Sequence, residues 1–203
     1  MFQDIPPQHR WNMDETGILE GLSSNGLVLG RSDKTFQLKK KVGSRCWTTI
    51  VECVSAVGQA LSPLVLFKGQ TLQQQWFPKD PAYLKEWLFK ATPNGWTDNL
   101  VALQWLEEVS IPQTKASRTT RRMLIVDGHG SHQTDDFMFE CFENGVQLLF
   151  LPAHASHVLQ PLDVSCFSPV KAAYCRAIQD IAFLACIDDT TPIGKATFLH
   201  CYH

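Results

Sequence analysis

The sequence predicts an α/β domain in which helices flank a mixed β-sheet. Strand-like segments come first along the chain, and helices then alternate with strands in the second half. In that half, residues 123–126 and 146–151 are uninterrupted apolar runs of strand length, which is typical of strands buried on both faces. With 203 residues, of which 44% are hydrophobic, the chain has enough apolar material for one sizeable core.

The N-terminal segments predict short strands separated by turns. Residues 10–14 are interpreted as a strand that ends at 16–17, and the turn signal at 23–26 predicts a hairpin-like excursion. The β-branched and aromatic run 47–54 is followed by a turn and by a second apolar run at 64–67. This pattern is typical of a β-hairpin.

The middle of the chain predicts one helix between two irregular segments. Residues 70–94 mix aromatic side chains with prolines and are expected to form a loop with a short helix. A helix start at 97–98 and an apolar stripe over 100–109 predict a helix that ends before Pro112. The basic and polar residues 113–122 are then expected to form a surface connection.

The C-terminal half predicts two further helices around the second apolar strand. The cap signal at 134–136 predicts a helix that ends at Glu143. Residues 146–151 form the next strand, and 152–161 are expected to be a polar loop. Apolar residues at helical spacing predict a long helix over 162–184.

Composition and charge narrow the possible partners. Eighteen Lys and Arg against twenty Asp and Glu give a formal net charge of -2, so no strong overall field draws the chain to nucleic acid or to an anionic membrane. The N-terminus does not resemble a signal peptide, and the most apolar stretch is too short to span a bilayer. Seven scattered cysteines fit neither a disulfide scaffold nor a zinc ribbon. We expect an intracellular protein with no membrane partner.

Basic residues concentrate in one segment. Residues 31–45 hold six positive side chains against a single acidic one. Within it, Lys39, Lys40, Lys41 and Arg45 are interpreted as a patch that contacts nucleic-acid phosphates. The alternative, a solvated hairpin surface, remains open.

Three aspartates lie at the boundaries of predicted elements. Asp14 and Asp127 each follow an apolar strand, and Asp163 falls at the start of the long helix. Since ligands meet α/β sheets at strand ends, the three carboxylates are expected at one edge of the sheet. Carboxylate oxygens suit Mg²⁺ or Mn²⁺. The alternative is that Asp14 and Asp163 are an ordinary turn residue and an ordinary helix cap.

The segments around these aspartates carry a resemblance to a known family. Each segment contains one aspartate: 11–17 (WNMDETG), 124–132 (LIVDGHGSH) and 151–164 (LPAHASHVLQPLDV). In their order along the chain and in the residues around each aspartate, they resemble the DDE superfamily endonuclease domain of pogo/Tigger-type transposases, which are related to mariner. The 35 residues between Asp127 and Asp163 are a spacing of the kind that such triads use. The resemblance covers roughly residues 10–182 and includes the predicted hairpin at 53–69.

The resemblance implies a ribonuclease H-like fold and a metal-dependent activity on DNA. It implies that Asp14, Asp127 and Asp163 are the catalytic residues and together bind two divalent ions, Mg²⁺ or Mn²⁺. The reaction would be phosphodiester cleavage at transposon ends followed by strand transfer into target DNA. A nuclear location and a possible homodimer follow as further expectations.

Histidines flank two of the aspartates. His129 and His132, and likewise His154 and His157, are spaced as H-x-x-H pairs. A dedicated zinc site is one interpretation, but we expect His129, His132 and His157 to shape the loops around the metal ions. Glu15 is excluded from the metal set, because successive strand residues point to opposite faces.

The predicted domain organisation is a catalytic core with little around it. Residues 1–185 are assigned to the DDE endonuclease core and residues 186–203 to a short, truncated C-terminal tail. Transposases of this kind usually carry DNA-reading helices before the core, whereas only nine residues precede Arg10. The alternative function is therefore a catalytically silent remnant or a domesticated nucleic-acid-binding protein.

Overall fold

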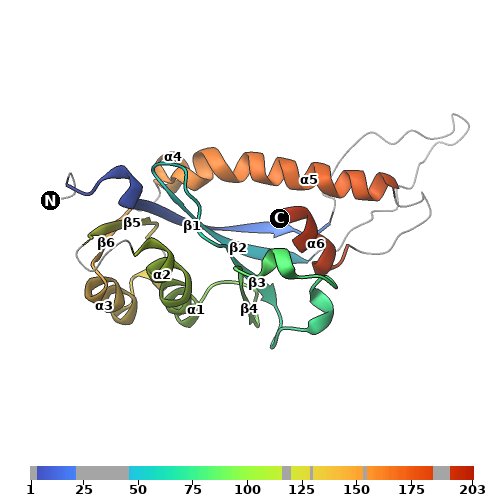
Figure 1. Ribbon diagram of the computed structural model, residues 1–203, viewed down its shortest axis with the longest axis horizontal. Coiled ribbons are helices and arrows are strands. Elements are labelled where there is room, and N and C mark those ends of the chain that lie inside the picture. Colours follow the sequence, from blue (N-terminus) through green and yellow to red (C-terminus); the bar gives the residue numbers. More distant parts are fainter. Residues whose placement is uncertain (1–3, 22–45, 116–119, 129, 153–154, 185–192) are drawn as a thin grey trace, which may run out of the picture.

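In the part of the chain that the structure describes, six strands form one mixed sheet (Figure 1). A computed structural model describes residues 4–21, 46–115, 120–128, 130–152, 155–184 and 193–203. The strands are β1 (Arg10–Leu19), β2 (Trp47–Ser55), β3 (Leu64–Lys68), β4 (Leu88–Thr92), β5 (Arg122–Val126) and β6 (Val146–Phe150). Their order is β4-β3-β2-β1-β5-β6, with antiparallel pairs from β1 to β3 and parallel pairs elsewhere. The predicted mixed sheet is confirmed.

Helices cover both faces of this sheet. The main ones are α1 (Asn99–Trp105), α2 (Ile111–Thr114), α3 (Asp135–Glu143), α4 (Ser156–Leu159), α5 (Phe167–Leu184) and α6 (Lys195–Tyr202). Two π-helical turns continue them, η4 (Leu106–Ser110) after α1 and η6 (Leu162–Cys166) before α5. Short 3₁₀ turns are η1 (Pro7–His9), η2 (Gln74–Trp76), η3 (Ala82–Leu84) and η5 (Gly130–His132). In Figure 1, α1, α2 and α3 lie on one side of the sheet and α5 crosses the other.

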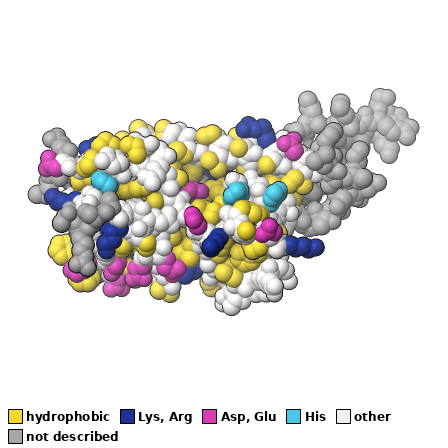
Figure 2. Space-filling view, in the orientation of Figure 1, with side chains coloured by type: hydrophobic (Ala, Val, Ile, Leu, Met, Phe, Trp, Pro, Cys, Tyr) yellow, Lys and Arg dark blue, Asp and Glu magenta, His cyan; other side chains and the backbone are white. Residues whose placement is uncertain are grey.

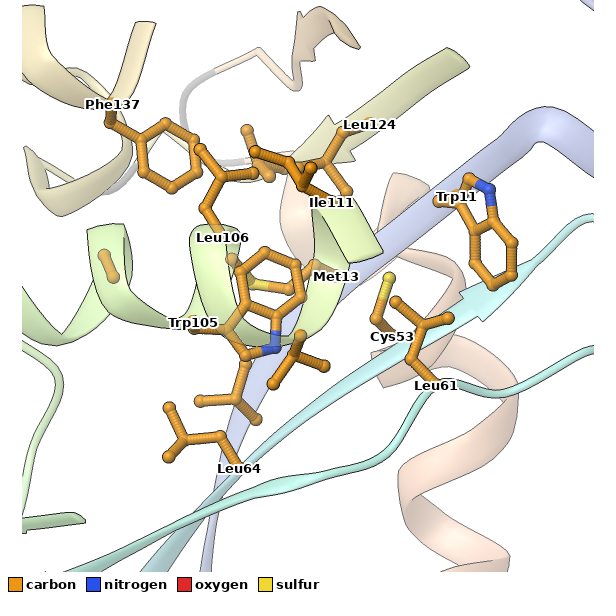
Figure 3. Packing of buried hydrophobic residues seen from close by; sticks show 14 of the residues in the cluster. Trp11, Met13, Cys53, Leu61, Leu64, Trp105, Leu106, Ile111, Leu124 and Phe137 are labelled. Atoms are coloured by element: carbon orange, nitrogen blue, oxygen red, sulfur yellow. The ribbon is translucent and has the colours of Figure 1, made fainter. Parts of the chain in front are cut away.

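The core between the sheet and helices α1 to α3 is built from alternate residues of the strands. Trp11 and Met13 of β1 belong to one buried cluster with Trp105, Leu106 and Leu124 of β5; Met13 lies beside Trp105, and Trp11 lies nearer to Leu61 (Figure 3). Period-two alternation along β1 places these odd-numbered side chains on one face of the sheet. Burial of this apolar surface is the main contribution that holds the helices to the sheet.

A second core lies on the opposite face, under α5 and α6. Ile18, Ile50 and Phe67 of the strands pack against Tyr174 of α5 and Phe198 of α6. Because Ile18 is an even-numbered residue of β1, this face is also the one that Asn12 and Asp14 share. Helix α6, which falls in the expected tail 186–203, is packed on this core; the boundary at residue 185 stays a prediction.

Most of the expected elements are confirmed. The hairpin β2–β3, the strands β5 and β6 and the long helical stretch from Leu162 to Leu184 lie where the sequence predicts them. Thr134 caps α3 by accepting a hydrogen bond from the amide of Phe137 at 3.3 Å. The expected excursion at 23–26 lies outside the described residues.

The first strand is longer than predicted. It continues through Gly17, which pairs with Thr49, and ends at Leu19 opposite Trp47. Gly17 is therefore no turn residue: a Cβ there would lie 3.3 Å from the indole of Trp47, so glycine allows that ring to lie against the strand. As a consequence, Asp14 lies in the middle of β1 and not after its end.

The prediction for residues 70–94 was wrong in one respect, because it missed the edge strand β4. Five residues of this segment, Leu88–Thr92, pair in parallel with β3. The prolines around this segment obscured the strand pattern in the sequence. In the structure, Phe89 of β4 stacks on Phe67 of β3 with ring centroids 6.4 Å apart. Tertiary packing thus outweighs the local pattern.

Three smaller predictions between the strands were also wrong. The helical stretch does not end before Pro112, because the π-helical turn η4 runs without a break into α2, and Ser110 and Ile111 keep helical backbone angles. Arg122 is buried, not part of a surface connection. The expected polar loop 152–161 contains α4.

Candidate functional site

Parallel pairing of β1 with β5 brings the first two aspartates to the same level of the sheet. Asn12 pairs with Ile125. Asp14 lies two residues after Asn12, still within β1. Asp127 lies two residues after Ile125 and is the first residue after β5. Segments more than a hundred residues apart thus place these two aspartates at the same level of neighbouring strands, where β5 ends.

The third aspartate comes from the turn that leads into α5. Asp163 is the second residue of η6, a π-helical turn that begins at Leu162. The amide of Leu162 donates to Asn12 Oδ1 at 3.2 Å, which attaches this turn directly to β1. Single π-helical turns occur frequently at functional sites, where they redirect a side chain. Here the turn carries the exposed carboxylate of Asp163 toward the same edge of the sheet.

Burial perturbs the carboxyl group of Asp14. Burial raises its pKa to about 7, and the negative charges of Asp163 and Asp127 add to this effect. The Glu15 amide, which donates to Oδ1 at 2.8 Å, and the nearby amide group of Gln160 lower the pKa in part. Within the described chain, the buried Oδ2 of Asp14 has no hydrogen-bond partner.

His132 joins Asp127 to the opposite face of β1. Its side chain is buried, with Nδ1 3.2 Å from Asp127 Oδ1 and Nε2 3.9 Å from Glu15 Oε1. Glu15 therefore faces away from Asp14, toward η5 and α3, as strand alternation predicts. The imidazole contacts the carboxylate of Asp127 from the side of the first core, where it also packs against Phe137.

The fit of this edge to divalent cations can be judged from its oxygen atoms. Asp14, Asp127 and Asp163 supply carboxylates, the ligands that Mg²⁺ and Mn²⁺ prefer. A buried carboxylate oxygen without a hydrogen-bond donor, as at Asp14 Oδ2, is suited to a cation. The arrangement is open, however: among the described residues, no three His, Cys, Asp or Glu side chains are grouped closely enough to hold a metal ion.

A comparison with protein families decides which family this is. The model of the DDE superfamily endonuclease matches residues 44–202. The chain belongs to this family. The resemblance to pogo-type DDE domains that the sequence motifs indicate is thereby confirmed, since relatives of the DDE domain include pogo transposable elements.

Two such relatives are curated proteins. A pogo transposable element with a KRAB domain from Mus musculus is 26% identical over 160 residues, which are 79% of this chain and 25% of that protein. A human pogo transposable element with a ZNF domain is 27% identical over 170 residues, 83% of this chain and 11% of that protein.

A third relative carries a different name. The protein called MFS-type transporter clz9 of Cochliobolus lunatus is 36% identical over 170 residues, 83% of this chain, but only 18% of that protein. The DDE domain thus spans a quarter or less of these three relatives' length. No helix in the described parts of the DDE domain is long and apolar enough to cross a membrane.

Solved structures show the same fold. The Mos1 mariner paired-end complex with Mn matches with a TM-score of 0.55 at 12% identity, over all of the DDE domain and 54% of that chain. The Mos1 strand transfer complex matches with a TM-score of 0.54 at 12% identity, over 97% of this chain and 51% of that chain. The ribonuclease H-like arrangement of the sheet and helices is confirmed.

Several predicted site residues of the DDE domain lie outside the described chain. These are Lys39, Lys40, Lys41, Arg45, His129 and His154. His157 belongs to α4, and its part in shaping the site stays a prediction.

Two amide side chains and one acid at the site had no assigned role from sequence. Asn12 and Gln160 lie buried between β1, β5 and η6, and Glu52 of β2 stands opposite Asp14 on the same face. Strand alternation is the signal that could have found Asn12, since it shares a face with Asp14 two residues later. Gln160 and Glu52 required the tertiary structure.

Proposed function

We propose that this DDE domain is the catalytic core of a transposon-derived DNA endonuclease, with Asp14, Asp127 and Asp163 binding two Mg²⁺ or Mn²⁺ ions. The observation that carries the proposal is that Asp127 and Asp163 lie near enough to Asp14 for their charges to raise its pKa, while the Asp14 oxygen Oδ2 is buried and without a hydrogen bond. Family membership supports the same chemistry.

The side chains have distinct tasks in this proposal. When bound, the ions would activate a water or a 3′-hydroxyl for attack on phosphorus and stabilise the leaving oxygen. Burial and the neighbouring acids raise the pKa of Asp14 to about 7, so its carboxyl group is about half protonated at neutral pH, and a bound cation would favour the ionised form. His132 contacts the Asp127 carboxylate through Nδ1 and orients it. Asp163 is the most exposed of the three carboxylates and so the most accessible to a substrate.

DNA is the proposed substrate, and surface charge favours one direction of approach. The Mos1 neighbours include a paired-end complex with the left transposon end. Acidic side chains gather over the helices on one side of the sheet (Figure 2), among them the exposed Glu107, Asp135, Asp136 and Glu143. Because such a surface repels phosphates, we infer that DNA approaches from the side of α4 and η6.

The further activities are proposals that concern a larger assembly. Strand transfer into target DNA, a nuclear location and pairing of two copies are proposed by analogy with whole transposases. Mos1 chains are about twice as long as this one, and the curated relatives are several times longer. The catalytic step is therefore the part to test first.

The decisive experiment is calorimetric titration of Mn²⁺, Mg²⁺ and Zn²⁺ into the purified chain. We expect Mn²⁺ and Mg²⁺ to bind, and each of Asp14→Asn, Asp127→Asn and Asp163→Asn to weaken binding about tenfold or more. Asp180→Asn is the matched control, because Asp180 is an exposed aspartate on α5, outside the site. In a second assay, nicking of supercoiled plasmid DNA with Mn²⁺, we expect the three site variants to lose activity and Asp180→Asn to retain it.

Other outcomes point to the alternatives. A folded chain that binds neither Mn²⁺ nor Mg²⁺ contradicts the nuclease proposal and favours a catalytically silent remnant or a nucleic-acid-binding protein. Binding of Zn²⁺ alone, insensitive to the aspartate variants, favours a histidine site.

A further inference from the structure

Two buried amide side chains face each other between the three segments that carry the aspartates. Asn12 is 4% exposed and Gln160 is fully buried. Asn12 Nδ2 donates a hydrogen bond to Gln160 Oε1 at 2.9 Å. Asn12 lies on β1, and Gln160 lies between α4 and η6, so this bond spans a separation of 148 residues along the chain.

The remaining hydrogen bonds of the pair end on backbone atoms beside the aspartates. Gln160 Nε2 donates to the carbonyl of Met13 at 3.1 Å, one residue before Asp14. Asn12 Oδ1 accepts from the amide of Leu162 at 3.2 Å, one residue before Asp163.

The third segment is attached in the same way. Asn12 Nδ2 also donates to the carbonyl of Ile125 at 3.1 Å, two residues before Asp127. One pair of amides therefore holds β1, β5 and η6 at fixed separations, each within two residues of a carboxylate. Both hydrogens of the Asn12 amide are used.

We propose that Asn12 and Gln160 are positioning residues that set the spacing of Asp14, Asp127 and Asp163 for metal binding. This inference rests on the proposed function. A hydrogen bond in a buried, low-dielectric setting is strong and directional, and a network in which each member is satisfied specifies one arrangement. Small displacements of ligands are costly for metal sites, because coordination distances are narrow.

The chemistry of the pair argues against simple filling of space. Burying two amides requires that their polar atoms find partners, and apolar side chains would fill the same volume without that requirement. Here the partners are backbone groups of three different segments, which an apolar side chain cannot join. The pair thus provides a geometric constraint in addition to packing.

The test compares Mn²⁺ affinity with folding stability in the full chain. Gln160→Met keeps the side-chain length but removes the bonds to Asn12 and to the Met13 carbonyl. We expect it to weaken Mn²⁺ binding about tenfold or more, measured calorimetrically at a temperature where circular dichroism shows a folded protein. Thr49→Val is the matched control: Thr49 Oγ1 donates to the Gly95 carbonyl at 2.8 Å in an equally buried position remote from the aspartates.

A second variant covers the case in which Gln160→Met does not fold. Asn12→Asp keeps an acceptor for the Leu162 amide but loses the two hydrogen bonds that Asn12 donates, to the Ile125 carbonyl and to Gln160 Oε1. Its added negative charge by itself favours cation binding, so weaker Mn²⁺ binding in this variant reports lost positioning. In the double variant, we expect the two losses to be less than additive, because both residues act through one network.

The outcomes separate this inference from the proposed function. Weakened Mn²⁺ binding in the amide variants with unchanged binding in Thr49→Val supports the positioning role. Unchanged binding in folded amide variants, while Asp14→Asn abolishes it, overturns the positioning role and leaves the nuclease proposal standing. No Mn²⁺ binding by the unmodified chain overturns both.

Discussion

Asp14 and Glu52 stand directly opposite each other in the antiparallel pair β1–β2, so two acids share one partly buried face of the sheet. Opposite residues in such a pair have Cβ atoms about 5 Å apart. Burial raises the pKa of both carboxyl groups, and a hydrogen bond from Tyr202 partly offsets the rise at Glu52. The protein is therefore stabilised when these two groups are protonated and is destabilised as they ionise at higher pH.

The first prediction concerns pH. The pKa of Asp14 rises from 3.8 to about 7 on folding, so between these values the native state holds a proton that the unfolded chain has lost. Raising the pH through this window therefore lowers the free energy of unfolding. We expect Asp14→Asn to be more stable than the unmodified chain at pH 8, by up to about 4 kcal/mol, and to show a smaller slope with pH. Urea unfolding in EDTA at pH 4.5 to 8 measures this, and equal slopes in both proteins would contradict it.

The second prediction concerns the partner of Glu52. Tyr202 on α6 donates to Glu52 Oε1 at 2.8 Å. In Tyr202→Phe, the ionised carboxylate loses this bond, so we expect a loss of about 2 kcal/mol in the free energy of unfolding at pH 8 and a smaller loss at pH 4.5. Tyr174→Phe is the control, because the Tyr174 hydroxyl donates to the backbone carbonyl of Glu20, which does not titrate. Similar pH dependence in both variants would show that the Tyr202 hydroxyl does not stabilise the ionised form of Glu52.

The layered fold could be predicted because each buried element has a strong local signal. Residues 123–126 and 146–150 are apolar runs that serve as β5 and β6, and the spacing over 162–184 follows one helical stripe. The edge strand β4 has no such signal. Its hydrogen bonds come from β3, and its aromatic side chains are positioned by neighbours distant in sequence.

The candidate site was predictable only in its acids. Motifs around Asp14, Asp127 and Asp163 indicated the three carboxylates, but sequence spacing contains nothing about the separation of their segments. That separation is set by the amides of Asn12 and Gln160, whose contacts cross 113 to 150 residues. Alternation correctly placed Glu15 on the opposite face, whereas its contact with His132 depends on how η5 packs.

The third prediction concerns Arg122, which the sequence placed on the surface. Its guanidinium donates to the Ile111 carbonyl at 3.1 Å, to Thr114 Oγ1 at 2.7 Å and to the carbonyl of Asn144. Arg122→Met leaves these buried acceptors without their donor, so we expect a loss of about 3 kcal/mol in the free energy of unfolding. Arg121→Met, at the exposed neighbouring position, should change it by less than about 0.5 kcal/mol. Equal effects in urea unfolding would show that burial of Arg122 contributes little.

The fourth prediction concerns His132 and its hold on Asp127. The buried imidazole lies between Asp127 Oδ1, at 3.2 Å, and Glu15 Oε1, at 3.9 Å, so it fixes the orientation of the aspartate from the side away from Asp163. In His132→Leu, the Asp127 carboxylate loses this contact, so its orientation is less closely fixed. We therefore expect Mn²⁺ affinity to fall about tenfold, with a smaller fall in His132→Asn, whose amide nitrogen can take the place of Nδ1.

Calorimetry with Mn²⁺ at pH 7.5, after circular dichroism has shown that each variant is folded, measures this effect. His200→Leu is the control, because His200 is exposed on α6 and lies beside Tyr83, with ring centroids 6.3 Å apart. If His132→Leu binds Mn²⁺ as tightly as His200→Leu does, the imidazole does not orient Asp127. If His132→Asn loses as much affinity as His132→Leu, the contact with Asp127 that the asparagine retains contributes nothing, and the loss is assigned to the contact with Glu15, which the asparagine side chain is too short to reach.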